Sequence, residues 1–246
     1  MRTYAIGDIH GHLDKLEQAH ALISDDRARC GDPDAQVVHV GDLVDRGPES
    51  CGVIQYLMDG QARGENWVVI KGNHDRMAAL FLRDYPRIDD QLLLDCNWFS
   101  PRIGGVETVA SYGVDVPEGI RTYQLHAKVL AAVPQAHRTY LDTLPAMHRA
   151  GDLCFVHAGI RPGVPLDQQT EDDLCWIRGE FHNDATDHGP LIIHGHTPVD
   201  QVTHYGNRVN IDTGAGHGKT LSTVVIEGRD VWLLTHEGRQ PALRNG

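Results

Sequence analysis

Short apolar runs along the chain each end in side chains that can bind metal ions or transfer protons. These side chains are carboxylates, imidazoles, one amide and one guanidinium: Asp8 and His10; Asp42, Asp45 and Arg46; Asn73 and His74; His157; and His196. Oxygen and imidazole ligands without a thiolate suit Mn, Fe, Zn or Mg rather than copper(I) or an iron–sulfur cluster. One carboxylate can bridge two cations, and cation pairs about 3.5–4 Å apart recur in enzymes that hydrolyse phosphate esters. The pattern therefore indicates a metal-dependent hydrolytic site.

The segments around these groups predict the elements that must position them. The first three apolar runs each lead into Gly and polar residues and then into helical periodicity, which is typical of strand–loop–helix units with a parallel core. We predict strands at residues 3–6, 37–40, 67–70, 153–156, 191–193, 209–211, 223–226 and 231–234, the last two as a closing hairpin. From residue 77 to about 144 the pattern is mostly helical, which predicts a helical insertion. Because functional groups gather at the carboxyl ends of strands in open α/β sheets, we expect the candidate residues to meet there.

Composition excludes several classes of protein. The chain has 246 residues, with 34 Asp+Glu against 22 Lys+Arg, a formal net charge of −12, and 16 His. This acidity argues against a broad electrostatic grip on nucleic acid or anionic lipid. No apolar run approaches the roughly 20 residues of a membrane span, and the N-terminus is unlike a signal peptide. Five Cys without a CxxC pair suit a reducing compartment. We therefore expect a cytoplasmic protein without nucleic-acid or membrane partners; the oligomeric state stays open.

The motifs at the strand ends resemble those of a known protein family. GDIHG, GDLVDRG, GNHD, HAG and HGHT, in this order, resemble the signature of the calcineurin-like metallophosphoesterase superfamily. More specifically, they resemble the phosphoprotein phosphatase family of serine/threonine protein phosphatases and its bacterial members. GGVETVASYG, FVHAGIRPG, CWIRGEF and NRVNIDTGAG extend the resemblance, so that it runs from residue 7 to residue 216. It implies an α/β fold in one domain, residues 1–246: a metallophosphoesterase β-sandwich of two mixed sheets, flanked by helices and carrying the helical insertion.

The resemblance also implies a dinuclear metal site. It assigns the metal ligands to Asp8, His10, Asp42, Asn73, His157 and His196. Asp8 and His10 would hold the first ion, and Asp42 would bridge both. We expect two divalent ions, with Mn²⁺ as the first choice and Fe, Zn or Mg as alternatives. An anionic bridge fits because two dications about 4 Å apart repel each other strongly.

The remaining candidates would act on the substrate. The resemblance makes His74 the general acid that protonates the departing alkoxide, with Asp45 orienting it through a hydrogen bond. Arg46 and Arg178 would bind phosphoryl oxygens, because the guanidinium fork matches their geometry. Lys71 could add a third positive group. Metal-bound hydroxide would attack phosphorus in line with the leaving group, without a phosphoenzyme.

The resemblance favours a serine/threonine protein phosphatase acting on phosphorylated proteins or peptides, and two other functions compete with it. The nearer one is a dinucleoside polyphosphate hydrolase on the same fold, which would make nucleotides the substrates. In symmetrical diadenosine tetraphosphate hydrolases the position of Asp45 is commonly Ala, giving GDLVARG, whereas this chain has GDLVDRG. That difference favours the phosphatase. The other is a catalytically dead binding module, which the complete set of assigned residues disfavours.

Several residues also have purely structural interpretations. Asp45 could cap the helix that begins near Pro48. His194 is predicted to be structural, and Asp212 to hydrogen-bond at the end of its strand. Among the other histidines, solvated surface positions are predicted for His20, His137, His148, His182, His188, His204 and His236.

Overall fold

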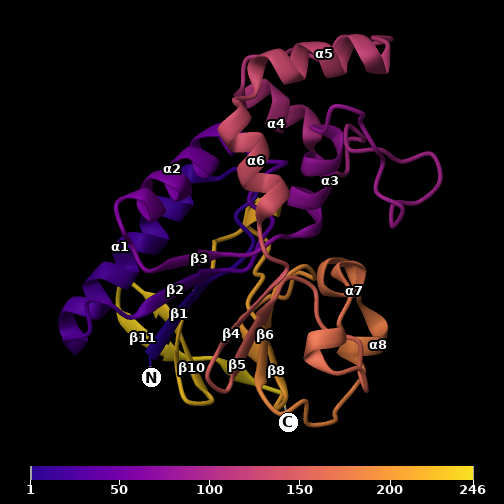
Figure 1. Cartoon of the computed structure of the whole chain (residues 1–246). Coiled ribbons are helices and arrows are strands. Elements are labelled where there is room, and N and C mark those ends of the chain that lie inside the picture. The colour runs from indigo at the N-terminus through magenta and orange to yellow at the C-terminus, as the bar shows by residue number, and fades with distance from the viewer. Residues whose placement is uncertain (1, 246) are drawn as a thin grey trace.

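Two six-stranded sheets face each other and carry helices on their outer sides (Figure 1). The computed structural model describes residues 2–245. In the order β11-β10-β9-β1-β2-β3, the first sheet comprises β11 (Gly238–Pro241), β10 (Asp230–Thr235), β9 (Thr223–Glu227), β1 (Arg2–Ile6), β2 (Gln36–His39) and β3 (Trp67–Val69). Within it β1, β2 and β3 run parallel, while β9, β10 and β11 pair antiparallel. The sheet is therefore mixed.

The second sheet is also mixed. In the order β12-β7-β8-β6-β5-β4, it comprises β12 (Leu243–Arg244), β7 (Thr203–His204), β8 (Arg208–Asn210), β6 (Leu191–His194), β5 (Leu153–Val156) and β4 (Met147–Ala150). Its centre, β5, β6 and β8, is parallel, so β5 and β6 end at the same edge. That edge is where their following loops place side chains.

Strand alternation produces the layers. On β1, Tyr4 and Ile6 point toward the helices, whereas Ala5 points toward the opposite sheet. On β5, Phe155 packs between the sheets, and Cys154 packs against the outer helices. All five side chains are fully buried. The sandwich therefore has one core between its sheets and one beneath each helical layer.

Helices cover both outer faces. The first sheet carries α1 (Leu13–Cys30) and α2 (Ser50–Ala62), and the second carries α7 (Glu171–Trp176) and α8 (Gly179–His182) (Figure 1). Between β3 and β4 the chain forms α3 (Asn73–Phe81), α4 (Gly105–Ser111), α5 (Thr122–Ala132) and α6 (Gln135–Thr143), which gather at one end of the sandwich. Within residues 2–245, no helix combines the length and apolarity needed to cross a membrane.

The predicted fold class is confirmed, and each predicted strand is present within one or two residues of its expected bounds. Four strands were not predicted: β4, β7, β11 and β12. Two of these have only two residues each, and β4 (MHRA) and β11 (GRQP) lack an alternating apolar pattern. They exist because a neighbouring strand offers backbone partners, which a local pattern does not encode.

Candidate active site

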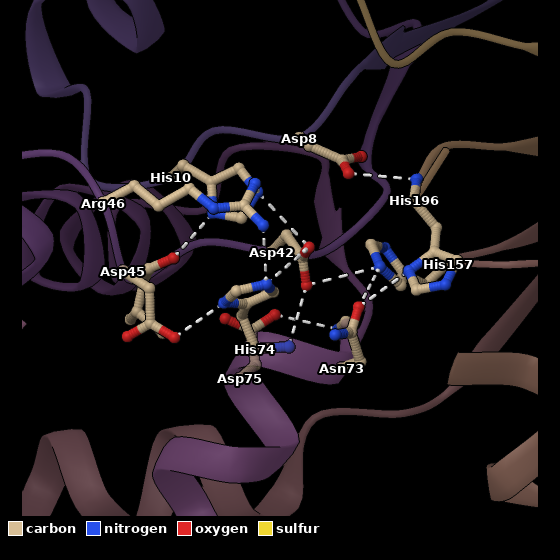
Figure 2. Close-up of polar contacts among 12 residues, drawn as sticks. Asp8, His10, Asp42, Asp45, Arg46, Asn73, His74, Asp75, His157 and His196 are labelled. Carbon is tan, nitrogen blue, oxygen red and sulfur yellow. Dashed lines mark hydrogen bonds and ion pairs between the residues drawn. The ribbon is translucent and has the colours of Figure 1, made fainter. Parts of the chain in front are cut away.

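The predicted ligand residues converge where the two sheets meet the insertion (Figure 2). They follow β1, β2, β5 and β6 or begin α3, and each is at most 7% exposed: Asp8, His10, Asp42, Asn73, His157 and His196. Two groups of side chains have ligand atoms within 4.8 Å of one another: His10, Asp42 and His74, and Asp8, Asp42 and His157. Asp42 belongs to both groups, which is the position expected of a bridging carboxylate.

Backbone strain is concentrated at this site. Six non-glycine residues among those described have positive φ angles: His10, Asp42, Asp45, Arg46, Asp95 and His196. All but Asp95 belong to the predicted site. Left-handed backbone costs a non-glycine residue roughly 1–2 kcal/mol, so it persists where the surrounding structure requires it. Such clustering is typical of functional sites.

Close backbone approach explains two glycines of the motifs. A Cβ at Gly195 would lie 2.0 Å from Asp8 Oδ1, and a Cβ at Gly72 would lie 2.2 Å from Asp42 Oδ1. Any side chain at these positions would displace a carboxylate. The GNHD and HGHT glycines therefore allow the two loops to close over Asp42 and Asp8.

Hydrogen bonds set the tautomers of two histidines. His10 Nδ1 lies 3.0 Å from the Val44 carbonyl oxygen, and His157 Nδ1 lies 2.8 Å from that of Val40. A carbonyl accepts only, so each Nδ1 carries a proton and each Nε2 is the atom that faces the site. Both Nε2 atoms face Asp42, at 3.4 and 3.3 Å from its carboxylate oxygens. A ligating histidine tied through its other nitrogen in this way is a frequent feature of metal sites.

Asn73 joins the histidines of the second sheet. Its Oδ1 lies 2.9 Å from His157 Nε2 and 2.8 Å from His196 Nδ1. The His196 backbone N–H donates to Asp8 Oδ2 at 3.0 Å, which connects the ends of β1 and β6. These contacts place the amide, two imidazoles and a carboxylate around a common point.

The donor set fits divalent cations. Asp8 Oδ1 and His196 Nε2 are buried without a hydrogen-bond partner among residues 2–245, which is costly unless a further group satisfies them. Burial and the neighbouring Asp212 carboxylate raise the pKa of Asp8 well above its usual value. Burial alone would lower the pKa of His157, but the Asp42 and Asp8 carboxylates raise it to about 10. The cluster thus favours added positive charge.

Beside this cluster lies a dyad of His74 and Asp45. His74 Nδ1 is 2.7 Å from Asp45 Oδ2, and both side chains are almost fully buried. Arg46 Nη2 lies 3.1 Å from His74 Nε2, and Arg46 Nη1 lies 2.7 Å from His10 Nε2 (Figure 2). The Asp45 side chain therefore contacts His74 instead of capping α2, whose first residue is Ser50.

Arg178 lies at the mouth of the site. Its exposed side chain places Nη1 3.4 Å from the hydroxyl of Thr197, the residue after His196. It also lines an open cavity of about 440 Å³ together with Trp176 and Arg161. The Trp176 ring stands edge-on to His196, with ring centroids 6.1 Å apart. This cavity therefore adjoins the predicted site through Arg178 and Trp176.

Other predictions need correction. Lys71 Nζ donates to the Asp142 carbonyl at 3.1 Å and lies 3.7 Å from Glu171 Oε2, so it is paired with the insertion and α7. His137 and His204 are 3% and 6% exposed, contrary to the predicted surface positions. In each case an oxygen distant in sequence accepts a hydrogen bond from Nε2, Gln55 Oε1 for His137 and the Arg229 carbonyl for His204.

Two structural predictions hold. His194 is fully buried, with its Nδ1 3.1 Å from the Gly195 carbonyl oxygen and its Nε2 3.3 Å from Arg208. Asp212 Oδ1 accepts the Gly214 N–H at 2.8 Å, at the end of β8. Both residues support the loops that carry the site.

Three contributing residues escaped the sequence interpretation. Asp75 accepts the backbone N–H groups of Leu43 and Gly72, each at 2.8 Å, and so ties the β2 loop to the start of α3. An acidic residue at the third position of a helix is the available signal for such a cap. Trp98 and Thr108, from the insertion, both donate to Asp45. Thr108 lies within the GGVETVASYG segment, but no role was assigned to any residue of that segment, and Trp98 lies in no quoted motif.

Together the fold and the site define a metal-dependent phosphoesterase, a class of hydrolase. Residues 1–239 match the family model of calcineurin-like phosphoesterases, and the chain belongs to that family.

Named relatives fall into two substrate classes. The chain is 26% identical to the asymmetrical bis(5'-nucleosyl)-tetraphosphatase PrpE of Anoxybacillus flavithermus, over 89% of this chain and 88% of that protein. It is 33% identical to Shewanella-like protein phosphatase 2 of Arabidopsis thaliana, over 72% of this chain and 52% of that protein. A solved structure provisionally described as a diadenosine tetraphosphatase shares the fold, with a TM-score of 0.62, 22% identity, and coverage of 100% of this chain and 95% of that chain. Of the two curated relatives, PrpE matches over more of this chain and over more of its own length.

Proposed function

We propose that the chain is a dimetal phosphoesterase whose first substrate class is dinucleoside polyphosphates. The observation that carries the hydrolytic part is the convergence of six buried ligand-type residues beside the His74–Asp45 dyad. The substrate class is supported by the bis(5'-nucleosyl)-tetraphosphatases, whose similarity extends over almost nine tenths of both chains. This ranking reverses the order expected from GDLVDRG alone.

In this proposal the six ligands would hold two divalent cations. When bound, such ions supply positive charge at the phosphoryl group and lower the pKa of a water molecule to about 7. Asp42 belongs to both ligand groups, and the Nδ1–H bonds of His10 and His157 keep their Nε2 atoms directed at it. The site residues thus provide a central carboxylate that imidazoles surround.

Proton transfer falls to His74. Its Nδ1 is bound to Asp45, so Nε2 is the atom that can give a proton to the leaving oxygen. Arg46 lies beside Nε2, and Arg178 approaches from the other sheet. These two guanidiniums bind the phosphoryl oxygens, which places the bridging oxygen of the substrate near His74.

The rest of a dinucleotide needs room beyond the phosphoryl group. The cavity of about 440 Å³ next to Arg178 lies within the roughly 300–1,000 Å³ range of small-molecule sites. Trp176 on its wall offers a ring for a nucleobase, since base–aromatic stacking contributes about 1–3 kcal/mol per base. The carboxylates on the rim are paired, Asp172 with Arg76 and Asp173 with Arg161.

Phosphomonoesters of proteins are the second candidate, and one observation favours them. An alkoxide is a poor leaving group and needs a proton, whereas a nucleotide leaves as a stable anion. A buried, fully hydrogen-bonded His74–Asp45 dyad is most useful for the alkoxide. The dyad therefore supports a phosphatase activity alongside, or in place of, dinucleotide cleavage.

A substrate panel tests the proposal. The Mn²⁺-loaded protein is incubated with diadenosine tetraphosphate and, separately, with a phosphoserine peptide, and kcat/KM is compared. We expect the dinucleotide to be the better substrate, and Trp176→Ala to raise its KM more than that of the peptide. Higher kcat/KM for the peptide would select the second candidate. Failure to hydrolyse either substrate at full metal content would contradict the hydrolytic assignment.

A further inference from the structure

Asp45 is held by more groups than its contact with His74 requires. Its carboxylate is fully buried and accepts hydrogen bonds from three side chains. His74 Nδ1 contacts Oδ2 at 2.7 Å, Thr108 Oγ1 donates to Oδ1 at 2.7 Å, and Trp98 Nε1 lies 2.9 and 3.0 Å from the two oxygens. Two of these three partners come from the insertion.

Thr108 holds both the backbone N–H and the side-chain carboxylate of Asp45. Its hydroxyl accepts the Asp45 backbone N–H at 2.8 Å while donating to the carboxylate of the same residue. The Asp45 side chain therefore cannot rotate about its Cα–Cβ bond without breaking the Thr108 hydrogen bond. Because Asp45 also has a φ angle of 74°, this anchoring maintains a backbone conformation that L-residues seldom adopt.

Trp98 closes the other side of the carboxylate. Its indole is 4% exposed and packs against Phe81 and Phe99, with ring centroids 5.3 and 5.0 Å away. Burial raises the pKa of Asp45, and the hydrogen bonds from His74, Thr108 and Trp98 oppose that rise. The carboxylate can therefore accept all of these hydrogen bonds in only one orientation.

The same segment also holds the neighbouring arginine. The Arg46 backbone N–H donates to the Gly104 carbonyl at 3.2 Å, between Trp98 and Thr108 in sequence. We propose that Trp98 and Thr108 are positioning residues for leaving-group protonation, locking the Asp45 carboxylate in the orientation that holds His74 Nδ1. The proposal rests on the general-acid role of His74 proposed above. Residues 98–108 of the insertion thus act on catalysis without touching substrate.

Leaving-group dependence tests this proposal in the Mn²⁺-loaded protein. The substrates are aryl monophosphates from 2,4-dinitrophenyl phosphate, whose leaving group needs no proton, to phenyl phosphate, whose leaving group does. We expect Trp98→Phe and Thr108→Val to lower kcat for phenyl phosphate by about 10-fold or more, below the roughly 10²–10⁴-fold limit of general acid catalysis. For 2,4-dinitrophenyl phosphate kcat should stay nearly unchanged, and KM should change little for both. Thr108→Ser, which keeps the hydroxyl, should retain the kcat of the parent protein for phenyl phosphate.

The chain offers matched controls. Trp67 is 9% exposed and Thr3 is fully buried, and neither Trp67 Nε1 nor Thr3 Oγ1 has a hydrogen-bond partner among residues 2–245. Trp67→Phe and Thr3→Val therefore make the same changes of volume without removing a donor from Asp45. The same graded loss in these controls would overturn the proposal.

His74→Asn separates failure of this proposal from failure of the acid role. If His74→Asn lowers kcat equally across the series, His74 is not the acid. If His74→Asn lowers kcat more for the substrates whose leaving groups need a proton, while the Trp98 and Thr108 variants show no such dependence, the positioning role is wrong. A readout independent of turnover is the downfield proton signal of His74 Nδ1–H in the NMR spectrum, identified by its loss in His74→Asn. The signal should move in Trp98→Phe and Thr108→Val and stay in the controls; an unmoved signal would overturn the proposal.

Discussion

The metal-ligand half of the site and the acid half are held in different ways. His10 and His157 are oriented by backbone carbonyls at the ends of the β2 region, those of Val44 and Val40. Asp45, in contrast, is oriented by side chains that lie more than fifty residues away in the insertion. The comparison teaches that the strand ends and the start of α3 assemble the ligands, whereas the acid also requires a second, separately packed region.

The largest effect is expected at Asp42, where the two halves meet. Asp42→Ala removes the carboxylate shared by both ligand groups and the acceptor of the His74 backbone N–H. We expect turnover to fall below detection and bound metal to fall below two ions per chain, measured by elemental analysis. The control is Asp34→Ala, an exposed position outside the site. Full metal content and turnover in Asp42→Ala would contradict the dinuclear assignment.

A smaller effect isolates the acid half. His74→Asn removes the proton donor but none of the six proposed ligands, so kcat for a phosphomonoester should fall by about 10²–10⁴-fold. Metal content should stay near that of the parent protein, because the sheet ends are untouched. His236→Asn, at an exposed position, is the control. Loss of metal in His74→Asn would show that the two halves are not separable.

The same division governs what the sequence could predict. Each ligand follows an apolar run, so strand prediction and ligand chemistry together were enough to bring Asp8, Asp42 and His157 to one place. Trp98 and Thr108 could not be assigned, because their contact with Asp45 depends on how the insertion packs on the β2 loop. Local pattern encodes an element but not the packing between elements.

The prediction that His137 and His204 lie at the surface was wrong for a related reason. His137 reads as a surface residue in a polar helix, yet it is buried by a hydrogen bond to Gln55, 82 positions away. His204 is similarly held by a carbonyl of a later turn. A polar side chain can be buried where a distant residue forms a hydrogen bond with it. The neighbouring residues in the sequence do not indicate which residue that will be. The edge strands β4 and β11 were missed on the same ground.

Gly104 tests the contact between the insertion and Arg46. It has a φ angle of 95°, and a Cβ there would lie 2.4 Å from the Arg46 backbone nitrogen. Gly113 has a similar φ angle of 79° but nothing within 4 Å of its Cβ position. Gly113→Ala should therefore cost only left-handed strain, lowering Tm by about 2–8 °C. Gly104→Ala should lower Tm further and reduce turnover. Equal effects of the two variants on Tm and kcat would show that the insertion does not hold Arg46.

Acid should lower the stability of the folded chain, and this effect should arise in the sheets. His39 on β2 is fully buried, with Nδ1 3.0 Å from the Val68 carbonyl and Nε2 3.1 Å from His20 Nε2. Burial lowers its pKa from 6.5 to about 4. Between these values the unfolded chain binds a proton that the folded chain does not, so stability falls as pH drops from 6.5 to 4.

The size and location of that effect can be measured by unfolding at several pH values. The shift corresponds to a loss on the order of 3 kcal/mol across the window. His39→Gln should lower stability at neutral pH and flatten this pH dependence. In the insertion, burial also lowers the pKa of His137, opposed by Asp59, so His137→Gln should flatten it less. If His137→Gln flattened the curve as much as His39→Gln, the sheets would not be the acid-sensitive region.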